Sequence, residues 1–395
     1  MYERLLASRL RDHRRSVLIL GPRQVGKSTL LNSLRPDLKI NLAHPATFRD
    51  YVTRPERLSD ELRALPGEGP QTVFIDEVQR APALLNLIQV ILDERPRRFR
   101  FLLSGSSARK LRRGQANLLP GRIHIHYLHP LLATELGEDF DLDRALAHGT
   151  LPGIYSEPDP ELRAEDLRSY TDAYLREEIQ AEALVRDIGG YGRLLELTAA
   201  CSGRIINVNA MCREAGVSYD TARRYLSVIE DTLIGFPVRA WSASDRTQLV
   251  AHPKLFFFDL GVRNALLRRP LDAPMPDERG LLMEHFVAYE LHRRLGSLWP
   301  EASLHHYRAR GGLEVDFVLT AGREIWAIEV KSGRDVNRSA IHALNRFGES
   351  KPEVTRRLVV YLGDRRQAID GVEVLPLRDF LRELPPLKDA SDARF

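Results

Sequence analysis

The sequence predicts an α/β protein of several domains, and three observations lead to this prediction. The chain has 395 residues, which is more than one compact core usually contains. Near the N-terminus, Val17 to Leu34 form a short β-rich run, a glycine loop and a helical pattern. Near the C-terminus, a helix precedes two strands joined by a turn, and all three carry acidic side chains.

Composition indicates a globular chain, with 43% hydrophobic and 28% charged residues. No apolar run approaches the roughly 20 residues that span a bilayer, and the first residues lack the apolar core of a signal peptide. We therefore expect a cytoplasmic protein without a membrane partner. The two cysteines, Cys201 and Cys212, fit a reducing compartment, and the net charge of +4 does not by itself identify a polyanionic partner.

The glycine loop matches the G-x-x-x-x-G-K-[ST] phosphate-binding pattern in the strand, loop, helix context that the pattern requires. Its glycines allow backbone N–H groups to face phosphates, and the helix that follows adds its dipole. Lys27 is expected to hold the β- and γ-phosphates of ATP, and Ser28 to ligate Mg²⁺. The predicted nucleotide-binding residues here are Gly21, Pro22, Arg23, Gln24, Val25, Gly26, Lys27, Ser28 and Thr29.

A second strand supplies the acidic residues that hydrolysis needs. Asp76 ends the apolar run Thr72 to Ile75 and is expected to hold the Mg²⁺ shell, while Glu77 would orient and deprotonate the attacking water. The next predicted strand ends in three serines, any of which could sense the γ-phosphate: Ser104, Ser106 and Ser107.

Residues 15 to 135 resemble the AAA+-related ATPases of bacteria and archaea whose second acidic strand continues Asp-Glu-x-Gln-x-x-Pro. The matching positions are Asp76, Glu77, Gln79 and Pro82, then Gly105 to Ser107, then Gly121 and Arg122. The resemblance implies a parallel P-loop sheet over residues 1–135 and a homo-oligomer. It also makes Arg122 a candidate arginine finger or sensor, with a plain exposed arginine as the alternative.

The middle of the chain predicts two smaller modules. Residues 136–200 read as a helical lid, since Leu162, Leu167, Tyr170 and Tyr174 recur at helical spacing. Residues 201–270 read as a winged helix-turn-helix, with a Gly-Val-Ser turn between two helices and an apolar strand pair after them. Arg223 and Arg224 on the second helix are the predicted DNA contacts, although the same fold also serves protein interaction.

Residues 278–385, before a tail at 386–395, carry Glu284 on a helix, Asp316 on one strand and Glu329-x-Lys331 on the next. This order resembles the PD-(D/E)XK nucleases, and the spacing from Gly280 to Glu284 is similar to that in archaeal Holliday junction resolvases. The resemblance implies a restriction-endonuclease-like domain in which the three acids hold Mg²⁺ and Lys331 positions the attacking water. A cross-strand or surface ion pair is the plain alternative for Glu329 and Lys331.

Together these modules predict an ATPase that binds and remodels duplex or branched DNA, with branch migration as one concrete task and cleavage left open. One rival is a nucleotide-dependent switch whose C-terminal domain binds a partner protein. Another is a defence nuclease in which ATP licenses cutting.

Overall fold

The computed structural model describes residues 2–67, 69–106, 119, 121–174, 187–241, 252–271, 273–295, 298–299, 301–309 and 311–384. Side chains of residues 173 and 174 are excepted. The chain divides into two compact units, of which the first is Met1–Pro130 with Asp231–Leu233 and the second is Leu131–Glu230 with Ile234–Phe395. None of the described helices is both long and apolar enough to cross a bilayer.

The first unit is built on a parallel five-stranded sheet of order β2-β3-β4-β1-β5. This confirms the predicted parallel sheet around the glycine loop. The strands are β1 (Ser16–Leu20), β2 (Leu38–Asn41), β3 (Gln71–Asp76), β4 (Phe99–Gly105) and β5 (Ile123–Tyr127). The helices are α1 (Leu5–Arg11), α2 (Lys27–Ser33), α3 (Pro45–Thr53), α4 (Arg57–Ala64) and α5 (Ala83–Glu94), with a 3₁₀ turn η1 (Val78–Arg80).

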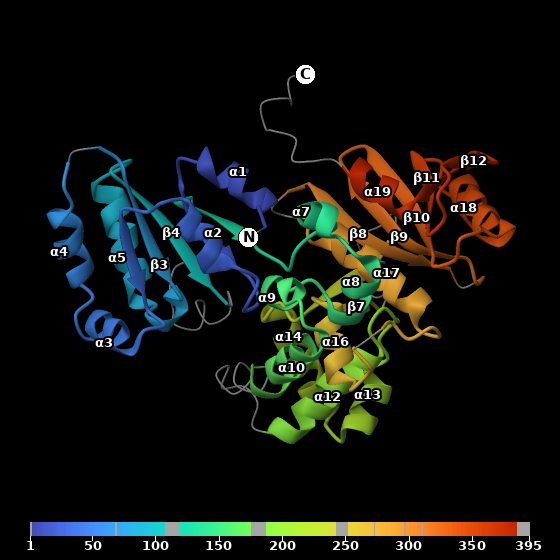
Figure 1. The fold of residues 1–395 in the computed structure, drawn as a ribbon, viewed down its shortest axis with the longest axis horizontal. Coiled ribbons are helices and arrows are strands. Elements are labelled where there is room, and N and C mark those ends of the chain that lie inside the picture. The colour runs from blue at the N-terminus through green and yellow to red at the C-terminus, as the bar shows by residue number, and fades with distance from the viewer. Residues whose placement is uncertain are drawn as a thin grey trace. The chain divides into compact units, whose positions relative to one another are not determined.

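Both faces of this sheet are covered, which explains its almost continuously apolar strands. One face packs with α3, α4 and α5 into a core that includes Leu18, Ile75 and Leu103. The alternate residues Val17 and Ile19 are also buried and belong to the face on which α1 and α2 lie. Figure 1 shows α5 and α2 on opposite sides of β3 and β4.

The second unit contains a mixed eight-stranded sheet of order β12-β13-β11-β10-β9-β8-β6-β7. Its strands are β6 (Gly235–Ala240), β7 (Lys254–Phe257), β8 (Ala302–Arg308), β9 (Glu314–Ala321), β10 (Glu324–Lys331), β11 (Arg356–Tyr361), β12 (Gln367–Ile369) and β13 (Val372–Pro376). Helices α17 (Arg279–His292), α18 (Arg338–Ser350) and α19 (Leu377–Glu383) belong to the same region. One sheet therefore joins two segments, because β6 and β7 come from residues predicted as a winged helix and β8 onward from the predicted nuclease-like domain.

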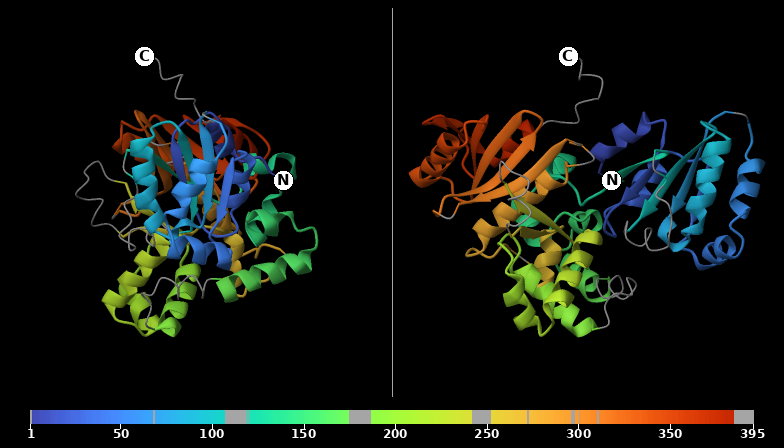
Figure 2. Two further views of the ribbon diagram at one scale, coloured as in Figure 1. Left: turned by 90° about the vertical axis from the view of Figure 1, so that its left-hand side faces the viewer. Right: turned by 180° about the vertical axis from the view of Figure 1, so that it is seen from behind.

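The remaining helices of this unit precede β6 or follow β7. They are α7 (Ala133–Leu136), η2 (Gly137–Asp139), α8 (Leu142–His148), α9 (Pro152–Ser156), α10 (Pro160–Ser169), η3 (Tyr170–Tyr174), α12 (Ile188–Ala200), α13 (Val208–Ala215), α14 (Tyr219–Asp231) and α16 (Leu260–Leu266). In Figure 2 the colour of these helices changes from green to yellow along the chain. The predicted lid helices thus belong to the same compact unit as the eight-stranded sheet.

A buried carboxylate ties α8, α9 and α16 together. Asp259 is fully buried and caps α16 by accepting the N–H groups of Gly261 and Val262 at 2.9 and 3.2 Å. Its other oxygen accepts the Thr150 N–H at 2.8 Å, between α8 and α9. Gly149 has a φ of +71°, and a Cβ there would lie 1.8 Å from Asp259 Oδ1.

Candidate functional sites

The phosphate loop connects β1 to α2 at the carboxyl edge of the parallel sheet. Gln24 and Gly26 have positive φ values of 61° and 91°, and these left-handed backbone conformations make the loop turn tightly. Gly21 has to be glycine because a Cβ there would lie 2.1 Å from the carbonyl oxygen of Leu128. The nine predicted nucleotide-binding residues therefore form one continuous loop and the first turn of α2.

Lys27 and Ser28 both make hydrogen bonds at this loop. The Lys27 side chain is buried, and its Nζ donates to the carbonyl oxygens of Gly21 and Pro22 at 2.8 Å each. Ser28 Oγ donates to Asp76 Oδ1 at 2.9 Å, so these two predicted Mg²⁺ residues are adjacent. A hydroxyl beside a carboxylate fits the hard-oxygen ligand set of Mg²⁺.

The end of β4 organises the two acidic residues. The Ser104 hydroxyl donates to Asp76 Oδ1 and accepts the Glu77 backbone N–H at 3.0 Å. Glu77 has a φ of 58°, and its carboxylate accepts the Gln79 side-chain amide, which also donates to Ser106 Oγ at 3.2 Å. Of the three serines predicted after this strand, Ser104 contacts Asp76 and Ser106 contacts Gln79, whereas Ser107 lies outside the described residues.

Arg122 lies away from the phosphate loop. It immediately precedes β5, and β5 runs parallel to β1 with Ile125 beside Leu18. The five-residue strand therefore separates Arg122 by about 16 Å from the edge where the loop sits. Its guanidinium binds both carboxylate oxygens of Asp93 at 2.7 and 2.9 Å.

The second candidate site lies where β9, β10, α17 and β7 meet. Lys331 Nζ donates to Glu329 Oε1 at 2.7 Å, as expected for side chains on one face of a strand. Asp316 Oδ2 accepts the Val330 N–H at 2.8 Å from the neighbouring strand. Glu329 Oε2 is buried and has no hydrogen-bond partner among the described residues.

Sequence reasoning missed a residue of this cluster, Lys254 on β7. Its buried ammonium contacts Glu284 Oε1 at 2.9 Å and Glu314 Oε1 at 3.3 Å. Lys254 is one of only seven lysines in the chain, and that scarcity is the one signal that could have drawn attention to it. Glu314, which starts β9, is a further carboxylate that was not predicted.

Burial makes this cluster electrostatically unusual. It raises the pKa of Glu284 to about 7, with Asp316 adding to the rise and Lys254 opposing it. Burial and Asp316 likewise raise the pKa of Glu329 to about 7, against the effect of Lys331. Burial also raises the pKa of Asp316. Carboxylates that depress one another's ionisation are characteristic of cation-binding and catalytic sites.

The carboxylates of Glu284, Asp316 and Glu329 are not close enough together in this structure to form a compact metal site. Among the described residues, the one group of three or more ligand side chains whose atoms all lie within 4.8 Å of one another consists of histidines in the first unit. Lys254 instead supplies the positive charge beside Glu284. The donor set fits Mg²⁺, but a cation shared by Glu284 and Asp316 has to compete with this ammonium.

The predicted DNA-contact arginines lie on α14, which follows α13 after a short turn. Gly216 ends α13 in the left-handed conformation, and Ser218 Oγ accepts the Thr221 N–H at 3.2 Å at the start of α14. Arg223 and Arg224 are exposed, and the Arg223 guanidinium lies 5.9 Å from the ring centroid of the exposed Tyr219. Residues 242–251, in the loop between β6 and β7, lie outside the described residues.

Three family models match successive parts of the chain. An "AAA domain" matches residues 13–137, and two domains of unknown function match residues 139–273 (DUF8612) and 279–380 (DUF4143). The first match supports the predicted AAA-type ATPase domain with ATP and Mg²⁺ as its ligands. The descriptions of the other two name no activity.

Two mycobacterial relatives match nearly the whole chain. "Uncharacterized protein Rv2008c" of Mycobacterium tuberculosis and "Uncharacterized protein Mb2031c" of Mycobacterium bovis are each 27% identical over 388 residues, 95% of this chain and 83% of theirs.

Similarity to solved structures is low. A structure of Pif1 helicases on forked DNA aligns with a TM-score of 0.26 at 14% identity, over 44% of this chain and 52% of that one. A DNA polymerase III gamma subunit-related protein from Thermotoga maritima aligns with a TM-score of 0.24 at 13% identity, over 74% and 100%. At these TM-scores neither alignment carries an argument about function.

Proposed function

From an N-terminal AAA-type ATPase domain and a C-terminal cluster of buried acids and lysines, we propose that this protein hydrolyses ATP to bind and remodel duplex or branched DNA. Movement of DNA junctions is the task that suits this combination best. The observation that carries the proposal is the cluster of Glu284, Glu314, Asp316 and Glu329 with Lys254 and Lys331. Such a concentration of partly buried charge is costly to fold and is characteristic of functional sites.

In the ATPase unit, Lys27 binds the β- and γ-phosphates, and Ser28 and Asp76 hold the Mg²⁺ ion. Glu77 orients and deprotonates the attacking water, with its carboxylate positioned by the Gln79 amide. Bound Mg²⁺ neutralises charge that develops on the phosphates. Because Arg122 is at the far edge of its own sheet, we propose that it serves as an arginine finger only toward the nucleotide of a neighbouring copy.

In the second unit, we propose that α14 binds duplex DNA through Arg223 and Arg224, and that the acidic cluster engages a phosphodiester in a winged-helix and PD-(D/E)XK-like arrangement. Glu284, Asp316 and Glu329 would hold Mg²⁺, which polarises the phosphodiester when bound. Lys331 would position water. Two exposed arginines beside an exposed tyrosine support DNA contact because they offer phosphate contacts and a stacking surface.

ATPase activity should be measured without DNA and with duplex, forked and four-way DNA at one salt concentration. We expect DNA to stimulate hydrolysis. Lys27→Ala should abolish hydrolysis but leave DNA binding intact, while Arg223→Ala with Arg224→Ala should remove both DNA binding and stimulation. Arg357→Ala, a change on β11 away from α14, is the control. Hydrolysis that no DNA accelerates would contradict the proposal.

The ion pair between Lys254 and Glu284 favours a second candidate, a nucleotide-dependent switch whose C-terminal unit binds a partner protein. In that case Lys254 neutralises the cluster permanently. Stimulation of hydrolysis by DNA separates the two, and cleavage of branched DNA in Mg²⁺ or Mn²⁺ tests whether the cluster uses a metal. If it does, Lys254→Met should lower the Mg²⁺ concentration for half-maximal cleavage and Asp316→Asn should abolish cleavage. Hydrolysis that no DNA accelerates, together with intact DNA for the wild type and Lys254→Met in both metals, would favour the switch.

A further inference from the structure

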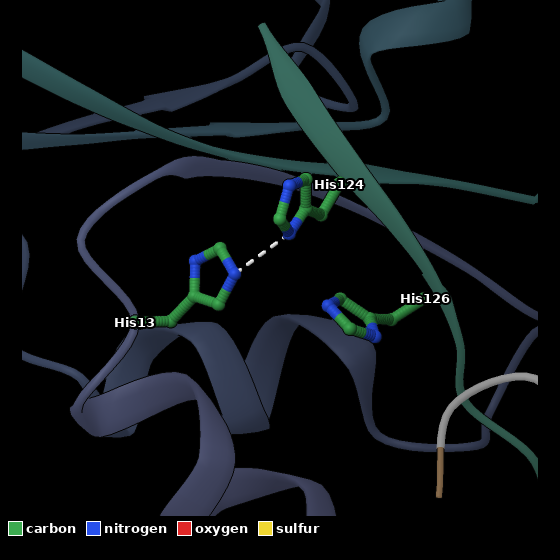
Figure 3. Close-up of side chains that lie close together, drawn as sticks. All are labelled: His13, His124 and His126. Atoms are coloured by element: carbon green, nitrogen blue, oxygen red, sulfur yellow. Dashed lines mark hydrogen bonds between the residues drawn. The ribbon is translucent and has the colours of Figure 1, made fainter. Parts of the chain in front are cut away.

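Three histidines from two segments meet beside the edge strand β5 of the first unit's sheet. His124 and His126 lie on β5 two residues apart, beside Val17 and Ile19 of β1. They therefore share the sheet face opposite the α3, α4 and α5 core. His13 follows α1 and faces them (Figure 3), and one ligand atom from each ring lies within 4.8 Å of the others.

The deepest of these rings has no hydrogen-bond partner. His126 is 5% exposed, and neither of its ring nitrogens has a partner among the described residues. A buried imidazole normally satisfies at least one nitrogen, because an unpaired polar atom costs about 1–3 kcal/mol. The two neighbouring imidazoles already interact, with His13 Nε2 and His124 Nδ1 at 2.8 Å.

His13 is held in the orientation that metal ligands usually have. Its Nδ1 lies 3.1 Å from the Arg15 carbonyl oxygen. The Arg15 backbone N–H also donates to this Nδ1 at 3.2 Å. The two backbone contacts fix the ring with Nε2 facing His124, and a ring fixed through its second nitrogen is characteristic of metal-ligating histidines. Metal binding uses the tautomer in which Nδ1 carries the proton and donates to the Arg15 oxygen.

We propose that His13, His124 and His126 form a binding site for a transition-metal dication of the zinc class, with a fourth position open to water. Three neutral imidazoles match the ligand preference of Zn²⁺ and exclude Mg²⁺, which takes oxygen ligands. Tetrahedral zinc places ligand nitrogens about 3.3 Å apart. Metal binding therefore requires the 2.8 Å pair to separate slightly and His126 to approach.

The charges around the site determine how strong it is. Arg9 on α1 acts on His13 and His126, and Arg100 on β4 acts on His13. The same arginines repel a dication, which favours a moderate and exchangeable site.

Metal at this site would connect α1 to the nucleotide loop. The ion would bind the segment after α1 to the edge strand β5. At the other end of α1, Arg4 donates to the Val25 carbonyl of the phosphate loop at 2.7 Å and to the His129 carbonyl at 2.6 Å. The site is thus placed to stabilise the helix that supports the loop.

Zn²⁺ binding should be measured by calorimetry on the full chain, with excess Mg²⁺ present to occupy the oxygen sites. Co²⁺ absorption should be recorded in parallel, because tetrahedral nitrogen ligation gives strong visible bands. We expect one Zn²⁺ per chain, a raised melting temperature and tetrahedral Co²⁺ bands. His124→Ala, at an exposed position that should not disturb folding, and His126→Gln should each weaken binding at least about tenfold.

His44→Ala removes an exposed histidine of the same unit and is the matched control, which should bind like the wild type. The proposal is overturned if His124→Ala and His126→Gln bind Zn²⁺ as tightly as His44→Ala, or if the wild type gives no tetrahedral Co²⁺ spectrum. A metal-dependent melting shift that persists in His124→Ala would also contradict it.

Discussion

At the scale of single residues, the nucleotide site depends on second partners as much as on the motif residues themselves. Asp76 Oδ1 accepts hydrogen bonds from both Ser28 and Ser104. Ser104 also anchors the Glu77 backbone. A single hydroxyl therefore orients both acidic residues of the site.

Replacing Ser104 with alanine should raise the Mg²⁺ concentration for half-maximal ATPase activity by about tenfold, because Asp76 loses the bond that fixes its rotamer. Ser106→Ala is the matched control, since Ser106 contacts Gln79 and not Asp76. It should change the Mg²⁺ requirement much less. Equal effects of the two substitutions, measured by Mg²⁺ titration of steady-state hydrolysis, would argue against this role.

A buried histidine on β8 should make the second unit sensitive to acid. Burial, with Lys254 adding to it, lowers the pKa of His306 to about 4, below the value near 6.5 of an unfolded chain. Its stabilising contribution is complete above about pH 6.5 and is lost as the pH falls toward 4, for a total of about 2–3 kcal/mol. His306→Asn should flatten the pH dependence of urea unfolding over this range, while His342→Gln, on the exposed face of α18, should not.

At the scale of elements, the regions with strong local signals were predicted and the long-range contacts were not. The strand, loop and helix around Lys27 follow from a glycine pattern and apolar runs that are readable within eighteen residues. The partnership of Lys254 with Glu284 joins β7 to α17 across thirty residues, and no spacing rule connects them. The strand alternation of His124 and His126 was visible in the sequence, but His13 could not be added without knowing that the segment after α1 lies beside β5.

The joint between α8 and α9 should tolerate no side chain at Gly149. Alanine there would combine a φ of +71° with a Cβ 1.8 Å from Asp259 Oδ1, so we expect a loss of roughly 2–4 kcal/mol in unfolding free energy. Gly153→Ala in α9 is the control, because its Cβ would meet nothing within 4 Å. That substitution should be neutral or slightly stabilising. Similar chemical denaturation curves for the two variants would contradict the argument.

At the scale of the whole molecule, each unit has a core of its own: one cluster joins α5 to the parallel sheet, and another joins α18 to the mixed sheet. Thermal unfolding should therefore show more than one step. A non-hydrolysable ATP analogue with Mg²⁺, at about 100 times its dissociation constant, should stabilise only the first unit, by about 2.7 kcal/mol. Hydrogen exchange can assign the shifted step to residues 2–130, and Lys27→Ala should show no shift.

The continuous sheet of the second unit also fixes the distance between helix α14 and the acidic cluster that contains Asp316. Helix α14 leads within a few residues into β6, which pairs directly with β8, and β8 pairs with β9, the strand that carries Asp316. Backbone hydrogen bonds, and no linker, thus determine how far the proposed DNA-binding helix lies from the proposed phosphodiester site. Under that proposal the protein would act as a ruler, engaging DNA at a constant number of base pairs from the position that α14 occupies.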